Sequence, residues 1–254
     1  MNYLEYWNYT YEEMAAAAGE LIAIQPIGSV EQHGPHLPLG TDSIICTAYM
    51  KALEERFARD AYPAVFLPLL PYGKSNEHLE FPGTITLSAT TLMDVLMEVG
   101  ESLARAGFKK MVFLNGHGGN HEILDLMCRE IRIATGMTVF AVHPSLKIPS
   151  KYGHELELPP LGIHAEKMET SLIFHVAPSL VREEKYVQDY PTNFEGMTYL
   201  DFSERVPFGW MTQDVSKTGV IGDPAGATAA QGQRFLEGLT DNLVDVFDEI
   251  RRYA

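Results

Sequence analysis

The chain has 254 residues, of which 46% are hydrophobic and 21% are charged, and its formal net charge is -15. This composition is typical of an ordinary soluble globular protein. The acidic balance argues against nucleic acid or an anionic membrane as the main partner. It does not identify a substrate, because a solvated acidic surface is common.

The two cysteines, Cys46 and Cys128, lie in apolar, helix-like segments, where cysteine usually packs as a small hydrophobe. We therefore expect no disulfide framework and a reducing, cytoplasmic location. Residues 1–10 lack the basic segment of a signal peptide, and no stretch is long and apolar enough to span a bilayer. The sequence thus predicts no membrane partner.

Periodicity predicts strands that alternate with helices. Thr10, followed by Glu13 three positions later, is a capping-box pattern that predicts a first short helix. Strands are predicted over 21–27, 64–70, 111–114 and 138–142, and helices over 42–60, 90–106, 121–134 and 164–177, with a final helix that reaches residue 252. Asn120 is well suited to cap the helix over 121–134. The alternation predicts an α/β fold with a mostly parallel sheet covered on both faces. Because we find no repeat or linker, we expect residues 1–254 to form one domain.

A polar cluster follows the first predicted strand. Glu31 and His33 alternate by two, so in an extended chain both side chains leave the same face. Asp42 follows after a turn rich in Gly and Pro and opens the next helix. Two carboxylates and an imidazole suit a divalent metal such as Zn, Mn or Fe. The alternative is a surface loop with ordinary polar residues.

The segment 115–120 contains His117 between glycines, directly after a strand and before a helix. One interpretation is a phosphate cradle built from backbone N–H groups, although the dinucleotide spacing and the P-loop lysine are absent. A second is a tight turn, and a third makes His117 a metal ligand. Ligands of parallel sheets bind at the carboxyl ends of the strands, so the fold brings His117 to the rim that carries Glu31. This favours the metal ligand.

Several motifs together resemble the creatininase (creatinine amidohydrolase) family over most of the chain. They are Glu-Gln-His-Gly at 31–34 through Asp42, Asn-Gly-His-Gly-Gly-Asn at 115–120, Glu-Thr-Ser at 169–171, Phe-Pro-Gly-Thr at 81–84 and the segment 219–224. The resemblance implies a three-layer α/β/α fold and a dinuclear metal hydrolase that cleaves a C–N amide-type bond. It also implies a homo-oligomer, often a hexamer.

The resemblance also implies how two divalent ions, Zn, Mn or Fe, are held. Glu31, Asp42 and His117 would hold one metal. His33 and the bridging Asp42 would hold the other. In creatininase a glutamate two positions after the histidine of the 115–120 motif completes the second metal, and here that position is Gly119. Our candidate replacement is Glu169, and the alternative is that Glu169 is a carboxylate on a helix face.

His164 matches the histidine that works as acid or base in this family, and an imidazole can pass a proton to a departing nitrogen near neutral pH. The implied mechanism is attack by a metal-activated water on an amide carbonyl. Glu77 and His78, in the long loop 71–84, are candidates to contact substrate or support ligands. For Glu77 the sequence favours the alternative of a solvated loop position. Gly118 and Gly119 are predicted substrate contacts.

The substrate is predicted only as a small-molecule amide, such as a cyclic amide, a formamide or a peptide. Creatininase closes its pocket with tryptophans shortly before its acid/base histidine, whereas this chain has only Trp7 and Trp210. Creatinine is therefore not the predicted substrate. Two alternatives stay open: a non-hydrolytic nucleotide- or phosphate-binding module using residues 116–120, and a degenerate family member that holds one metal.

Overall fold

The computed structural model describes residues 4–145, 148–151, 161–202 and 205–253. Four parallel strands form the central sheet in the order β2-β1-β3-β4. Their bounds are β1 (Ile22–Ile27), β2 (Ala64–Phe66), β3 (Lys110–Asn115) and β4 (Thr138–Val142). All six residues of β1 are buried, because this central strand is covered on both faces.

Helices cover the two faces of the sheet. The α-helices are α1 (Tyr11–Ala17), α2 (Thr41–Asp60), α3 (Ala89–Ala106), α4 (His121–Thr135), α5 (Lys167–Val176), α6 (Thr212–Val215) and α7 (Ala229–Arg252). Short 3-10 helices lie at η1 (Tyr6–Asn8), η2 (Asn76–His78), η3 (Gly118–Asn120), η5 (Pro178–Leu180) and η6 (Glu183–Lys185). None of the helices in the described residues is long and apolar enough to cross a membrane.

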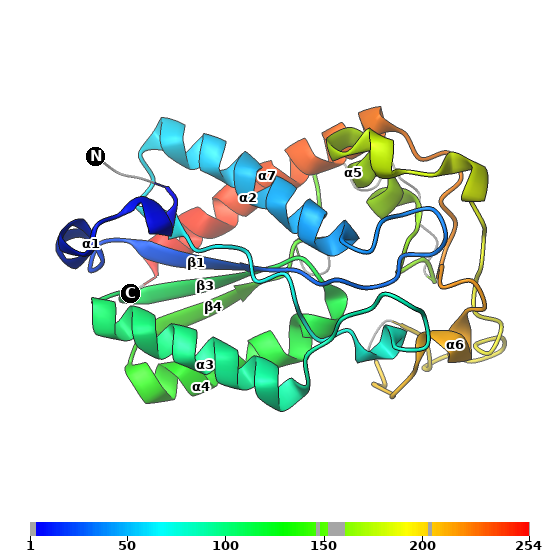
Figure 1. Cartoon of the computed structure of the whole chain (residues 1–254), viewed down its shortest axis with the longest axis horizontal. Coiled ribbons are helices and arrows are strands. Elements are labelled where there is room, and N and C mark those ends of the chain that lie inside the picture. Colours follow the sequence, from blue (N-terminus) through cyan, green and yellow to red (C-terminus); the bar gives the residue numbers. More distant parts are fainter. Residues whose placement is uncertain (1–3, 146–147, 152–160, 203–204, 254) are drawn as a thin grey trace.

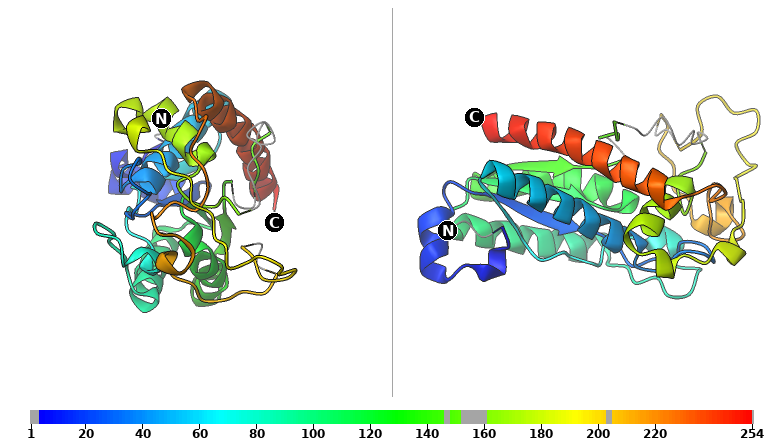
Figure 2. Two further views of the ribbon diagram at one scale, coloured as in Figure 1. Left: turned by 90° about the vertical axis from the view of Figure 1, so that its right-hand side faces the viewer. Right: turned by 90° about the horizontal axis from the view of Figure 1, so that it is seen from above.

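Alternate strand residues build two separate cores. Ile24 and Phe66 pack in the core shared with α2, α5 and α7, whereas Val65 and Phe113 pack in the core shared with α3 and α4. The sheet therefore lies between two helical layers (Figure 1), and α7 runs along it beside α2 (Figure 2). This architecture confirms the predicted three-layer α/β/α class. The loops that follow the strands gather near α6, at the end of the molecule opposite α1 (Figure 1).

Two predicted boundaries were wrong. β2 ends at Phe66 rather than at residue 70, because its register with β1 shifts there: Ile24 pairs with Phe66, but Ile27 pairs with Leu70, one residue further along than a continuous ladder requires. Beyond Phe66 the chain is joined to β1 by isolated hydrogen bonds, such as the one that Leu70 N donates to the carbonyl of Pro26 at 3.0 Å. α5 begins at Lys167 rather than at residue 164, because Ala165 has a φ of 54° and Glu166 caps the helix with its side chain.

Candidate metal centre

The predicted ligands converge from four parts of the chain. Glu31 and His33 follow β1, Asp42 lies in the first turn of α2, His117 follows β3, and Glu169 lies in the first turn of α5. Glu31 and His33 are each 1% exposed, and Asp42 and His117 are also buried. The structure therefore brings together side chains that the sequence separates by more than a hundred positions.

Asp42 lies between two groups of donors. Its Oδ2 is 2.8 Å from His117 Nδ1, and its Oδ1 is 3.2 Å from His33 Nε2. One donor atom each of Glu31, Asp42 and His117 lies within 4.8 Å of the others. On the other side, His33 Nε2 is 3.8 Å from Glu169 Oε2. The two oxygens of one carboxylate thus face two distinct sets of donors.

In three of the imidazoles, one ring nitrogen, here called the outer nitrogen, is hydrogen-bonded to a backbone carbonyl. His33 Nδ1 lies 3.3 Å from the carbonyl oxygen of Glu31, and His117 Nε2 lies 3.0 Å from that of Lys74. His164 Nε2 lies 2.8 Å from the carbonyl oxygen of Gln32. A carbonyl can only accept, so each of these nitrogens donates its hydrogen and the opposite nitrogen faces the carboxylates. Metal-ligating histidines are commonly oriented in this way.

The charges of the cluster fit divalent cations. Burial raises the pKa of Glu31 to about 7. Burial alone would lower the pKa of His33, but the charge of Asp42 outweighs it and raises this pKa to about 9. The same competition, in which Glu31 and Asp42 outweigh burial, holds the pKa of His117 well above its usual value. In the protein alone, protons on these imidazoles therefore balance the carboxylates.

Glu31 supplies a further observation in favour of a metal. Its Oε2 is buried and has no hydrogen bond, although His117 Nε2 lies 3.2 Å away. Among the described residues, no lysine or arginine forms an ion pair with Glu31, Asp42 or Glu169. Buried carboxylates without such a partner are costly unless a cation compensates them. The residues present therefore fit a divalent metal.

His164 is positioned by the segment 219–224 that the sequence singled out. Its backbone N–H donates to the carbonyl of Ile221 at 3.1 Å and its carbonyl accepts from Ile221 N at 3.0 Å. The imidazole contacts the tilted ring of His33 and stacks on the ring of His78, with ring centroids 4.2 and 4.4 Å away. Burial holds the pKa of His164 well below its ordinary value, so the ring is neutral.

A cavity of about 530 Å³ opens from this cluster. Glu77, His78, Gly118 and Gly119, the predicted substrate contacts, all line it. Its lining also includes an apolar set that was not predicted: Ile163, Phe202, Val206, Pro207, Phe208 and Trp210. Sequence reasoning missed this wall because the loop that supplies most of it has no periodic pattern. The unassigned tryptophan at 210 was its only signal.

Gly119 leaves no room for a side chain. A Cβ atom there would lie 2.5 Å from Glu77 Oε1 and 2.6 Å from His117 Nε2, and it would meet the carbonyl oxygen of Lys74. Glu77 Oε1 lies 3.5 Å from His117 Nε2, and its side chain is only 18% exposed. The carboxylate of Glu77 therefore fills the space beside position 119, and the solvated alternative for Glu77 is wrong.

Asn120 occupies the predicted N-cap position of α4, but its side chain makes no capping hydrogen bond to the helix. Its Oδ1 accepts from Lys74 N at 2.8 Å, and its Nδ2 donates to the carbonyl of Gly28 at 3.2 Å. Asn115 holds the other side of the loop, since its Oδ1 accepts from His117 N at 3.1 Å and its Nδ2 donates to the His117 carbonyl at 2.8 Å. Both asparagines fix the backbone on which His117 stands.

A buried carboxylate–histidine cluster, beyond the carboxyl ends of a parallel sheet and beside a cavity, defines a metal-dependent hydrolase. Comparison with known proteins narrows this class. The chain belongs to the creatininase family, whose model, described as creatinine amidohydrolase, matches residues 7–247. The predicted family and its metal-dependent amide hydrolysis, with an unspecified substrate, are thereby confirmed.

Two relatives and two solved structures illustrate the similarity. A mycofactocin precursor peptide peptidase of Mycobacterium tuberculosis is 34% identical, over 86% of this chain and 81% of its own length. A creatinine amidohydrolase of Pseudomonas putida is 29% identical, over 93% of this chain and 92% of its own. A creatininase variant of Zn-Zn type has a TM-score of 0.78 at 26% identity and full coverage of both chains. A manganese creatininase has a TM-score of 0.77 at 25% identity, covering 99% of this chain and 100% of its own.

Proposed function

We propose that the protein hydrolyses a C–N amide-type bond at a centre of two divalent cations on either side of Asp42. The observation that carries this proposal is the placement of Asp42, whose Oδ2 faces His117 while its Oδ1 faces His33. Glu31, Asp42 and His117 would hold one cation, and His33, Asp42 and Glu169 the other. Bound there, such cations lower the pKa of a water molecule and polarise a carbonyl group.

His164 is the proposed acid and base. Its Nε2 is held by the carbonyl of Gln32 at 2.8 Å, so its Nδ1 carries the lone pair and faces Glu31 Oε1 at 3.8 Å. A neutral imidazole can accept the proton of the attacking water and then donate it to the leaving nitrogen. The ring contacts with His33 and His78 and the pairing with Ile221 keep this nitrogen directed at the cluster.

The cavity supports an amide that carries an apolar group. Phe208 and Trp210 line it together with the carboxylates, and the Phe202 and Trp210 rings have centroids 5.3 Å apart. Aromatic walls contribute large apolar contact areas to bound groups. The sequence identity to the mycobacterial precursor peptide peptidase also supports a peptide as the substrate. We therefore propose a peptide bond beside an apolar side chain as substrate, rather than creatinine.

The phosphate-binding alternative is not supported by the geometry of residues 116–120. The N–H groups of Gly116, His117 and Asn120 donate within the protein, to the Ile27 carbonyl, to Asn115 Oδ1 and to the His117 carbonyl. They are thus not available for a phosphate. The carboxylates that line the cavity would also repel one.

The test combines metal analysis with a substrate screen. Purified protein saturated with Zn²⁺ or Mn²⁺ should hold about two ions per chain, as expected of a dinuclear site, and Asp42→Asn should lose both together. Turnover of apolar peptides should exceed that of formamides, cyclic amides and creatinine. No turnover of any substrate by protein with two ions per chain would refute the hydrolase proposal. A single ion without turnover would instead identify a degenerate family member.

We also propose a homo-oligomer and a single domain over the 254 residues. The resemblance to the family supports the first, and the two cores that share one sheet support the second. Light scattering during size-exclusion chromatography would measure the oligomer. A single cooperative unfolding transition would support one domain.

A further inference from the structure

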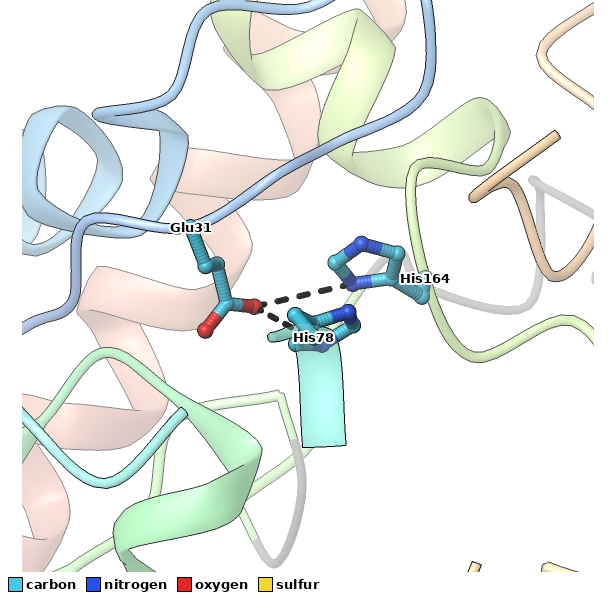
Figure 3. Close-up of side chains that lie close together, drawn as sticks. All are labelled: Glu31, His78 and His164. Carbon is cyan, nitrogen blue, oxygen red and sulfur yellow. Dashed lines mark ion pairs between the residues drawn. The ribbon is translucent and has the colours of Figure 1, made fainter. Parts of the chain in front are cut away.

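His78 differs from the three imidazoles whose outer nitrogens meet carbonyls. Its Nε2 lies 3.3 Å from Glu31 Oε1, which is also the oxygen nearest to His164 Nδ1 (Figure 3). Its Nδ1 lies 2.8 Å from the side-chain amide nitrogen of Gln32. A side-chain amide, rather than a backbone carbonyl, therefore determines which nitrogen of the His78 ring carries the hydrogen.

The orientation of the Gln32 amide is fixed by two backbone groups. Its Oε1 accepts from Gly34 N at 2.9 Å, and its Nε2 donates to the Gly219 carbonyl at 3.0 Å. An N–H on one side and a carbonyl on the other allow only one placement of the oxygen and the nitrogen. Since one of the two amide hydrogens serves Gly219, a single hydrogen remains.

That remaining hydrogen has one acceptor. His164 Nε2 lies 3.1 Å from the amide nitrogen, but it already donates to the Gln32 carbonyl at 2.8 Å and cannot accept. Gln32 must therefore donate to His78 Nδ1. Thr212 Oγ1 lies 2.7 Å from the same Nδ1 and 2.8 Å from the Glu77 carbonyl, and its single proton can serve either. Gln32 has no such freedom, so it decides the tautomer.

We propose that Gln32 and His78 are positioning residues for the metal centre. Gln32 keeps His78 Nδ1 bare, so His78 Nε2 carries the hydrogen and donates it to Glu31 Oε1. This hydrogen bond holds Oε1 of Glu31. It thereby turns Oε2, the buried oxygen without a hydrogen bond, toward the cation that Glu31 would share with Asp42 and His117. Glu31, His78 and His164 are close enough to resemble a metal site, but His78 presents a hydrogen and not a lone pair there. The inference rests on the metal centre of the proposed function.

A double-mutant cycle on Zn²⁺ affinity tests it. Gln32→Glu places an acceptor against His78 Nδ1 and should reverse the tautomer, so Zn²⁺ affinity should fall about 10- to 100-fold, as for other lost supporting partners of metal ligands. His78→Gln keeps an N–H toward Glu31 and should stay within about fivefold of the wild type, because one hydrogen bond replaces another. On that background Gln32→Glu should cost less than about threefold, since no tautomer is left to set.

Equal losses from Gln32→Glu in both backgrounds would mean that Gln32 only supports the local backbone, and the inference would be wrong. Thr212→Val is the matched control, because it removes the other contact to the same nitrogen; a loss there that exceeds the loss in Gln32→Glu would also overturn the assignment. Nitrogen-15 NMR of the zinc-loaded protein should show a bare Nδ1 on His78, and a protonated one would contradict it directly.

The outcomes separate this inference from the proposed function. If the wild type binds no zinc, or if Asp42→Asn binds it as well as the wild type does, the proposed metal centre fails. If zinc binding depends on Asp42 but the cycle shows no coupling between positions 32 and 78, only the positioning role fails. Urea unfolding of each metal-free variant confirms that the fold is retained.

Discussion

Gly119 offers a sharp test of the packing around His117, because its neighbour provides a matched control. A Cβ atom at Gly119 would meet the Lys74 carbonyl oxygen, the Glu77 carboxylate and the His117 ring, whereas a Cβ atom at Gly118 would have no atom within 4 Å. Both substitutions to alanine add the same methyl group to adjacent positions of η3. Only the first adds it to an occupied space.

The expected magnitudes differ accordingly. Gly119→Ala should cost about 1–3 kcal/mol of unfolding free energy, as overpacking generally does. The backbone carbonyl of Lys74 cannot easily retreat, because Lys74 N is hydrogen-bonded to Asn120 Oδ1 at 2.8 Å. Gly118→Ala should stay within about 1 kcal/mol and can even stabilise, since alanine restricts the unfolded chain. The His117 ring must also move in Gly119→Ala, so its Zn²⁺ affinity should fall.

Urea unfolding of the metal-free and zinc-loaded proteins measures both effects. In a chain of this size each kcal/mol also corresponds to about 2–4 °C in Tm. If Gly119→Ala matched Gly118→Ala in stability and in zinc affinity, the space beside His117 would not be as closely filled as the structure describes. The same result would remove the explanation for a glycine at a position where creatininase has a glutamate.

Three further substitutions probe other parts of the molecule. Burial acts to raise the pKa of Asp189, but hydrogen bonds from the loop 216–218 outweigh it and lower this pKa below its ordinary value of 3.8. Asp189→Asn should therefore be less stable than the wild type near neutral pH. In urea titrations this difference should be complete above the ordinary pKa and should shrink as the pH falls through the lowered one. Gly232→Ala would place a methyl group on the Ser171 carbonyl, where α7 meets α5, and should lower stability by about 1–3 kcal/mol in the same assay; an unchanged midpoint would contradict that contact. Trp210→Ala should raise KM for apolar peptides more than for formamides, and equal effects on both would separate the aromatic wall from substrate binding.

Much of the fold was predictable, because strands and helices here follow their apolar periods, and α3 and α4 end at Gly107 and Gly136. The exceptions have local causes. The register between β1 and β2 shifts by one residue beyond Phe66, and Ala165 and Glu166 delay the start of α5. Asn120 has the residue type of a helix cap, but its side chain is used between loops, and nothing in the sequence indicates that choice.

The candidate site was predictable only in part. Alternation at Glu31 and His33 and the rule for strand ends bring them together with His117. His164 and Glu169 required the resemblance to the family. The role of Gln32 depends on contacts with residues that lie 46 and 132 positions away, and such contacts leave no local pattern.

The wide spacing of the proposed ligands has a consequence for the life of the protein in the cell. Because they come from segments between positions 31 and 169, a partly folded chain must already have folded over most of this span to bring them all together. Metal would then bind only the complete native state, and at a hundred times the dissociation constant it adds about 2.7 kcal/mol to the free energy of unfolding. The supply of metal would thus determine how often the chain unfolds and becomes accessible to proteases. A lack of metal would shorten the lifetime of the protein as well as abolish its activity.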